Sequence, residues 1–107
     1  MTKSRVSRLS EAERRQLFAR HPLWEPLAER DAIRRRLRFA DFAEAFRFMS
    51  GAAAAAEAIH PYPEWSNLEA SVDILLTTHD LEGLSQHDAA LAQHIDELAL
   101  LFGASQG

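Results

Sequence analysis

Three helix-start signals, spaced along the chain, most strongly constrain how this sequence can fold. In each, a short polar residue is followed three positions later by an acidic one. The pairs are Ser10 with Glu13, Asp41 with Glu44, and Ser85 with Asp88. Such a pair caps the free amides of a first helical turn. We therefore expect helices to begin just after residues 10, 41 and 85.

Prolines, glycine and apolar spacing indicate how far these helices run. The first should end near His21, because the residue before a proline avoids helical dihedral angles. The second should run to about Ile59, with an apolar stripe of Phe42, Phe46, Met49, Ala53 and Ala56. The third should end at Gly103, with a stripe of Leu91, Ile95, Leu98 and Phe102.

The two segments between the helices show the two-residue period of strands. Residues 24–39 read as a strand pair: 24–29, a turn near Arg30-Asp31, and a strand in which Ile33, Arg35, Leu37 and Phe39 alternate with Ala32, Arg34, Arg36 and Arg38. Residues 64–80 are also extended, with Val72, Ile74, Leu76 and Thr78 on one face. The order α-β-β-α-β-β-α predicts an α+β two-layer sandwich. Three helices should cover one face of a four-stranded antiparallel sheet.

Length and composition fit one small domain. The 107 residues divide into a leader at 1–8, a domain at 9–103 and a tail at 104–107. A net charge of -4 argues against nucleic-acid binding. The chain has no cysteine, no apolar run long enough to span a membrane and no secretory signal, so we expect a cytoplasmic protein.

His79 is the histidine best placed for chemistry. It follows a predicted strand within Thr77-Thr78-His79-Asp80, just before a glycine turn. Strand ends and the loops after them often hold functional side chains on a rigid support, and a histidine there could exchange a proton near neutral pH. The plainer alternative is a polar strand-end residue facing water. For His21 and His94 we expect only solvated or packed side chains.

A second cluster of titratable residues closes the second helix: Glu57, His60, Tyr62 and Glu64. Glu57 and His60 would share a helical face, where a carboxylate could orient an imidazole. A solvated last turn is the alternative. No second ligand pair has zinc spacing, so we expect no metal.

Three further features have structural as well as functional interpretations. Asp88 lies in the first turn of a predicted helix, where a carboxylate is favourable, so a structural role alone would explain this residue. Trp65 could stack on a planar heterocycle or lie in the core. The arginines on one strand face could contact phosphates or form a solvated or subunit-facing surface; they are Arg34, Arg36 and Arg38.

Together these segments resemble the pterin-4a-carbinolamine dehydratase family over about residues 9–100. Residues 30–49 resemble the family's second strand and second helix, and Pro63-Glu64-Trp65-Ser66-Asn67 resembles the segment after its histidine pair. Leu76-Thr77-Thr78-His79-Asp80, followed by Gly83-Leu84-Ser85 and Asp88, resembles its second signature.

The resemblance implies the fold expected above, a homodimer or homotetramer, and a hydro-lyase that needs no cofactor. The reaction would be loss of water from 4a-hydroxytetrahydrobiopterin, giving a quinonoid dihydropterin. His79 would be the main acid–base residue, helped by His60 or Tyr62. Glu57 would orient a neighbour, and Asp88 would support His79 or the pocket. The remaining residues expected to line the substrate site are Pro61, Pro63, Trp65, Thr77, Thr78 and Asp80.

The chain departs from the family pattern at the histidine pair, whose positions hold Pro61 and Tyr62. His60 could replace one of the missing histidines, or Tyr62 could donate a hydrogen bond to the leaving hydroxyl. A tyrosine phenol ordinarily has a pKa of about 10 and is a poor base at neutral pH. Alternatively the site is catalytically weak, and the chain is a protein-binding coactivator or assembly scaffold with a protein partner.

Overall fold

The predicted order of helices and strands is confirmed by the computed structural model, which describes residues 6–60 and 62–106. The elements are α1 (Glu11–Arg20), β1 (Glu25–Pro26), β2 (Ile33–Arg38), α2 (Phe42–Ile59), β3 (Glu64–Leu68), β4 (Ser71–Leu76), the short 3₁₀ turn η1 (His79–Leu81), α3 (Gln86–Leu101) and β5 (Ser105–Gln106). Each helix begins at its predicted cap. The side chains of Ser10, Asp41 and Ser85 all accept a hydrogen bond from an amide of the first turn.

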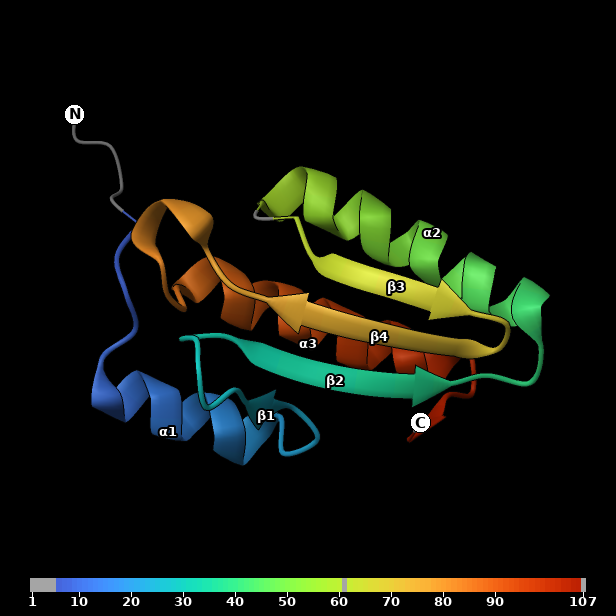
Figure 1. The fold of residues 1–107 in the computed structure, drawn as a ribbon, viewed down its shortest axis with the longest axis horizontal. Helices are drawn as coiled ribbons and strands as arrows, with labels where there is room; N and C mark the ends of the chain where they lie inside the picture. Colours follow the sequence, from blue (N-terminus) through green and yellow to red (C-terminus); the bar gives the residue numbers. More distant parts are fainter. Residues whose placement is uncertain (1–5, 61, 107) are drawn as a thin grey trace.

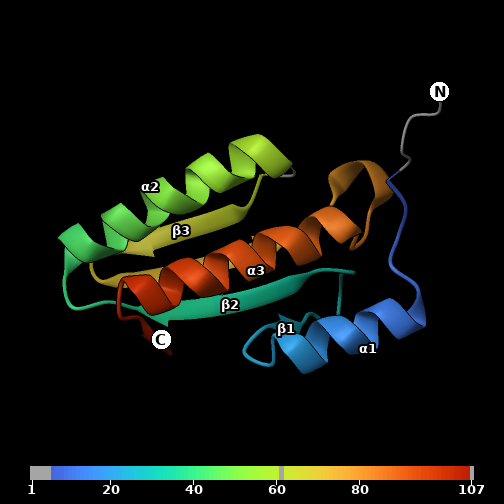
Figure 2. The same ribbon diagram turned by 180° about the vertical axis from the view of Figure 1, so that it is seen from behind.

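The sheet is antiparallel, and its strands lie in the order β1-β2-β4-β3 (Figure 1). The central pair, β2 and β4, is in register from Ile33 opposite Leu76 to Arg38 opposite Ser71. α2 and α3 lie antiparallel across one face, as the view from behind shows (Figure 2). The predicted α+β two-layer architecture is therefore confirmed.

The core fills the space between this face and the helices. Alternate residues of β2 and β4 point into it, among them Ile33 and Ile74, and all are almost fully buried. Phe48 of α2 and Ile95 of α3 meet them from the helix layer. α2 and α3 approach closely at Gly51, where a methyl group in place of the glycine hydrogen would lie 3.2 Å from Leu98.

A polar cluster joins α1 to this core through Asp96 of α3. One carboxylate oxygen accepts hydrogen bonds from the Trp24 indole (2.8 Å) and from Arg35 (2.5 Å), which is 7 % exposed. The other oxygen lies 2.7 Å from Nδ1 of His21. The ion pair with Asp96 explains how Arg35, a charged residue, can be buried on the helix-facing side of β2. It also places α1 on the same side of the sheet as α3.

The sequence predicted the strand lengths at the sheet edge incorrectly. The first strand, expected over 24–29, is only the two residues of β1, since Pro26 has no N–H with which to continue the ladder. The expected tail contains β5, in which Ser105 and Gln106 pair with Arg38 and Leu37. Within the described residues the sheet therefore has five strands, and β1 and β5 both pair with β2.

The predicted apolar stripe of α2 was wrong at three of its five residues, whereas Ala56 is buried and Met49 packs against the core. Phe42 and Phe46 are 56 % and 58 % exposed, and Ala53 is exposed. The buried residues are Ala45, Phe48, Ala52 and Ala56. The helix is apolar around most of its circumference, so periodicity alone could not decide which stripe meets the sheet.

The open face of the sheet carries the predicted arginine row. Arg34 makes two hydrogen bonds to Asp73 of β4, at 2.9 and 2.5 Å, and Arg36 lies 3.8 Å from the same carboxylate. These contacts hold the pKa of Asp73 below its ordinary value. Within residues 6–60 and 62–106, no helix has both the length and the apolar character needed to cross a membrane.

Candidate active site

An open cleft of ≈ 760 Å³ lies where the end of α2, the start of β3, η1 and the first turn of α3 meet. Its lining combines histidine, tyrosine and carboxylate side chains with a few apolar ones. The lining residues are Val6, His60, Tyr62, Pro63, Glu64, Thr78, His79, Asp80, Leu81 and His87. The cleft thus joins the two sequence segments from which an acid–base site was predicted.

His60 and Tyr62 form one wall of the cleft. His60 ends α2, and its amide donates to the carbonyl of Ala56 at 2.7 Å. Its φ of 53° is in the left-handed region, which a non-glycine residue adopts only at a cost of roughly 1–2 kcal/mol. The rings of His60 and Tyr62 meet edge to face, with centroids 4.8 Å apart. The sharp exit from the helix therefore turns both side chains toward one site.

His79 lines the same cleft and is linked to a carboxylate. Its Nε2 lies 2.6 Å from Oε2 of Glu64, the first residue of β3. Arg30 donates two hydrogen bonds to the same carboxylate, at 3.0 and 2.9 Å. Arg30 and then His79 lower the pKa of Glu64 to about 2, so this carboxylate is ionised at neutral pH. His79 also borders a second hollow of ≈ 460 Å³, on the side of Arg30.

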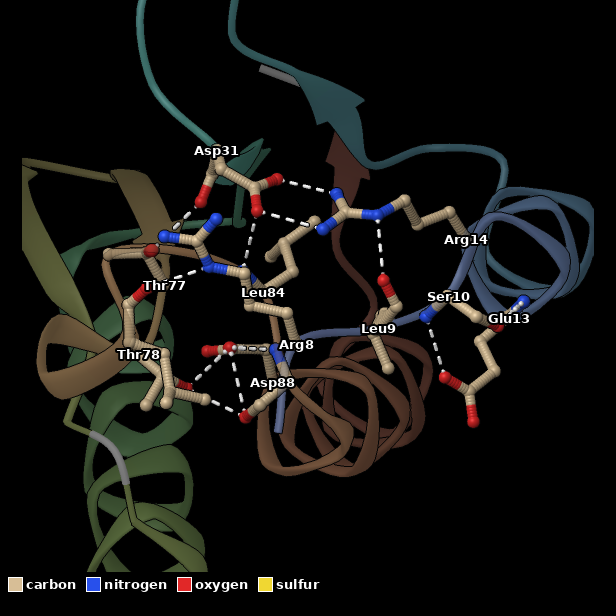
Figure 3. A network of polar contacts seen from close by, with 12 residues as sticks. Arg8, Leu9, Ser10, Glu13, Arg14, Asp31, Thr77, Thr78, Leu84 and Asp88 are labelled. Carbon is tan, nitrogen blue, oxygen red and sulfur yellow. Dashed lines mark hydrogen bonds and ion pairs between the residues drawn. The ribbon is translucent and has the colours of Figure 1, made fainter. Parts of the chain in front are cut away.

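Behind the cleft, Asp88 supports Thr78 (Figure 3). Asp88 is fully buried, and its Oδ2 accepts hydrogen bonds from the Thr78 hydroxyl (2.7 Å) and the Ser85 amide (2.9 Å). Its Oδ1 is buried with no hydrogen-bond partner in the described part of the chain. Burial raises the pKa of Asp88, against the lowering effect of these hydrogen bonds. Asp88 therefore acts on the pocket through Thr78.

Asp31 braces the segment that carries His79 from the other side (Figure 3). Its carboxylate accepts two hydrogen bonds from Arg14 of α1, at 2.5 and 2.8 Å, and one from the Leu84 amide at 3.1 Å. The carbonyl of Asp31 accepts a hydrogen bond from the Thr77 hydroxyl at 2.8 Å. The Arg14 guanidinium holds the pKa of Asp31 below its ordinary range. The loop between β4 and α3 is thus held at both ends.

The structure brings six of the eleven predicted site residues to the cleft: His60, Tyr62, Pro63, Thr78, His79 and Asp80. Glu57 is exposed and is not part of the lining, and Trp65 packs against the core. Thr77 lines the neighbouring hollow, whereas Asp88 lies behind the wall. Pro61 lies outside the described residues.

Sequence reasoning assigned no role to two polar residues of the lining. Glu64 was grouped with the cluster after α2, but nothing local indicated that Arg30, 34 positions earlier, would bind it. His87 is in the first turn of α3, where its position after the Ser85 cap was the only available signal. In the part of the chain that the structure describes, no three His, Asp or Glu side chains are grouped as a metal would require.

An open cleft with three imidazoles, a phenol and an ionised carboxylate can exchange protons with a small organic ligand. The fold and site together define a small α+β protein equipped for acid–base chemistry. Residues 7–98 match the family model described as pterin 4 alpha carbinolamine dehydratase, and the chain belongs to this family. The resemblance inferred from the sequence is confirmed.

Relatives and a solved structure agree with this assignment. The chain is 47% identical over 94 residues to a Burkholderia orbicola protein and 46% identical to one from Burkholderia multivorans. Each match covers 88% of this chain and 92% of the relative, and both relatives are named "Putative pterin-4-alpha-carbinolamine dehydratase". The fold is also similar to the crystal structure of a transcriptional coactivator/pterin dehydratase from Brucella melitensis. The TM-score is 0.82 at 35% identity, covering 87% of this chain and 99% of that one.

Proposed function

We propose that this protein removes water from a 4a-hydroxytetrahydropterin and releases a quinonoid dihydropterin. The observation that carries this proposal is that His60 lines the same cleft as His79. His60 can therefore supply an imidazole near the position left by the family's histidine pair. Had His60 faced away from the cleft, only one imidazole of the predicted set would have remained in place.

The reaction requires two proton transfers on one substrate. The bond between C4a and its hydroxyl breaks as an acid protonates the oxygen, and water leaves. A base removes the proton from N5, and the electron pair of that N–H bond forms the new C=N bond. Positioned groups contribute about 10²–10⁴-fold each to such a step.

We assign the N5 proton to His79 and the leaving hydroxyl to His60 and Tyr62. His79 suits the base role because Glu64 can stabilise the imidazolium that forms. His60 can donate a proton and Tyr62 a hydrogen bond to the departing oxygen. The contact between their rings allows both to serve one substrate atom.

Dehydration of freshly generated 4a-hydroxytetrahydrobiopterin, followed by ultraviolet absorbance, tests this function. The His60→Ala and Tyr62→Phe variants separate the two candidates for assisting the departure of the hydroxyl. We expect turnover well above the uncatalysed rate, with the larger loss in His60→Ala. If the wild-type protein leaves the uncatalysed rate unchanged, the dehydratase proposal fails.

A second candidate function, protein binding, is supported by an apolar surface away from the cleft. The start of α2 and the end of α3 lie at the same end of the molecule (Figure 2). There Phe42, Phe46, Leu100 and Leu101 are between 56 % and 84 % exposed. Exposed apolar patches of this kind mark protein-interaction sites. We propose that a second copy or another protein covers this surface. The homo-oligomer, like the cytoplasmic location, remains a prediction.

A further inference from the structure

His79 depends on a polar contact for its orientation. Its side chain is 63% exposed, so packing constrains the ring little. Among the described residues, the His79 ring makes one hydrogen bond, and its partner is Glu64. The two residues come from separate elements, since Glu64 begins β3 whereas His79 begins η1. A contact between two elements fixes the ring relative to the sheet.

Glu64 is itself held on two sides. Its backbone pairs with Leu75 of β4, which anchors the residue in the sheet. Arg30, in the loop before β2, binds both carboxylate oxygens through two nitrogens. This fork-to-fork arrangement fixes the carboxylate plane more firmly than a single contact would. The carboxylate therefore presents Oε2 to His79 in one orientation.

The chemistry of the contact determines which ring nitrogen carries hydrogen. With its pKa lowered to about 2, Glu64 is ionised and can only accept hydrogen bonds. Nε2 of His79 must then be the donor. In the neutral ring this leaves the lone pair on Nδ1, the nitrogen able to take a proton.

We propose that Glu64 is a positioning residue, which holds the His79 ring in one rotamer and in its Nε2–H tautomer so that Nδ1 exchanges the proton with the pterin, and that Arg30 fixes Glu64 for this purpose. The catalytic part of this inference rests on the proposed dehydratase function. The orientation of the ring does not, and it can be measured without substrate.

The test compares Glu64→Ala, which removes the acceptor, with Glu64→Gln, which keeps an oxygen that can accept from Nε2. For each variant, ¹⁵N shifts of the His79 ring at pH 8 report the tautomer, and three-bond couplings report χ1. We expect one rotamer and the Nε2–H tautomer in the wild type, and mixtures of both in Glu64→Ala. Turnover should fall by about 10-fold or more in Glu64→Ala with little change in KM. Glu64→Gln should recover most of the ordered His79 ring and most of the turnover.

Asp73→Ala is the matched control, because it removes a carboxylate that is bound by two nitrogens of Arg34 on the same sheet, outside the cleft. It should leave the His79 ring and turnover as in the wild type. A single rotamer and tautomer in Glu64→Ala would overturn the proposal, whatever its activity. If the ring becomes disordered as expected but the wild type has no activity, the positioning role stands and the dehydratase function fails.

Discussion

Replacing the buried Asp88 tests how the wall behind the cleft is built. Its carboxylate is the shared acceptor for the Ser85 amide and the Thr78 hydroxyl, and its other oxygen has no partner among the described residues. Asp88→Ala removes both contacts. Asp88→Asn keeps one oxygen for them and removes the charge. The two variants therefore separate the hydrogen bonds from the buried negative charge.

The expected losses follow from which donors lose their partners. In Asp88→Ala the Thr78 hydroxyl can still bond to Oγ of Ser85, 2.7 Å away. The buried Ser85 amide, in contrast, loses its acceptor. This unsatisfied buried amide, at the N-cap of α3, should cost about 2–3 kcal/mol of unfolding free energy. For a domain of this size that lowers Tm by about 8–12 °C. At neutral pH, Asp88→Asn should stay within about 1 kcal/mol of the wild type, since it also relieves a buried charge.

The pH dependence has a definite sign. The folded-state pKa of Asp88 is raised above its ordinary 3.8, so as pH rises the unfolded chain releases this proton first. The stabilisation from the protonated acid is complete below the unfolded pKa and is lost as pH rises through the folded one. Asp88→Asn lacks this titration. From pH 4.5 to 7.5, the wild type should therefore lose stability relative to Asp88→Asn.

Urea unfolding of the three proteins at pH 4.5 and 7.5 measures these differences. Asp41→Ala, which removes the exposed cap of α2, is the control and should cost about 1 kcal/mol. The role given to Asp88 is refuted if Asp88→Asn is as destabilised as Asp88→Ala at neutral pH. It is also refuted if the difference between wild type and Asp88→Asn does not change with pH.

Three further changes test other parts of the structure by urea unfolding. Asp96→Ala removes the partner of the buried Arg35 and should cost about 3–5 kcal/mol; a loss below about 1 kcal/mol would contradict the ion pairing. Gly83→Ala should cost about 1–3 kcal/mol, since the new methyl group would lie 2.4 Å from Oδ2 of Asp31; an unchanged midpoint would show that the loop yields freely. The pKa of Glu64 is lowered, so its stabilisation is present above its unfolded value of 4.5 and is lost as pH falls toward 2. Glu64→Gln should therefore lose less stability than the wild type between pH 5 and 2.5, and equal losses would contradict the pairing.

The helix starts could be predicted because a cap is a local interaction. Ser10, Asp41 and Ser85 bond to amides only two or three residues away, so the sequence contains all the information needed. The face of α2 that meets the sheet is different. Phe42 and Phe46 looked like core residues, but Ala45 and Phe48 offered a competing stripe. Only the packing of α2 on the sheet decides between them.

Edge strands and site contacts depended on partners that are distant in the sequence. β5 forms because Ser105 and Gln106 meet the end of β2, almost 70 positions earlier in the chain. Residues 61–63 and 77–80 were expected to line one site only because the family resemblance implied it. The link from Arg30 through Glu64 to His79 was not predicted, since no local pattern pairs a loop arginine with the first residue of a later strand.

The proposed chemistry depends most directly on His79 as the proton-exchanging residue. The decisive measurement is the rate of dehydration of freshly generated 4a-hydroxytetrahydrobiopterin by the wild type, His79→Ala and His94→Ala. His94 is an exposed histidine of α3 outside the cleft and serves as the matched control. We predict rapid turnover by the wild type and His94→Ala, and a loss of about 10²-fold or more in His79→Ala. Equal rates for the wild type and His79→Ala would contradict the assignment of this cleft as the active site.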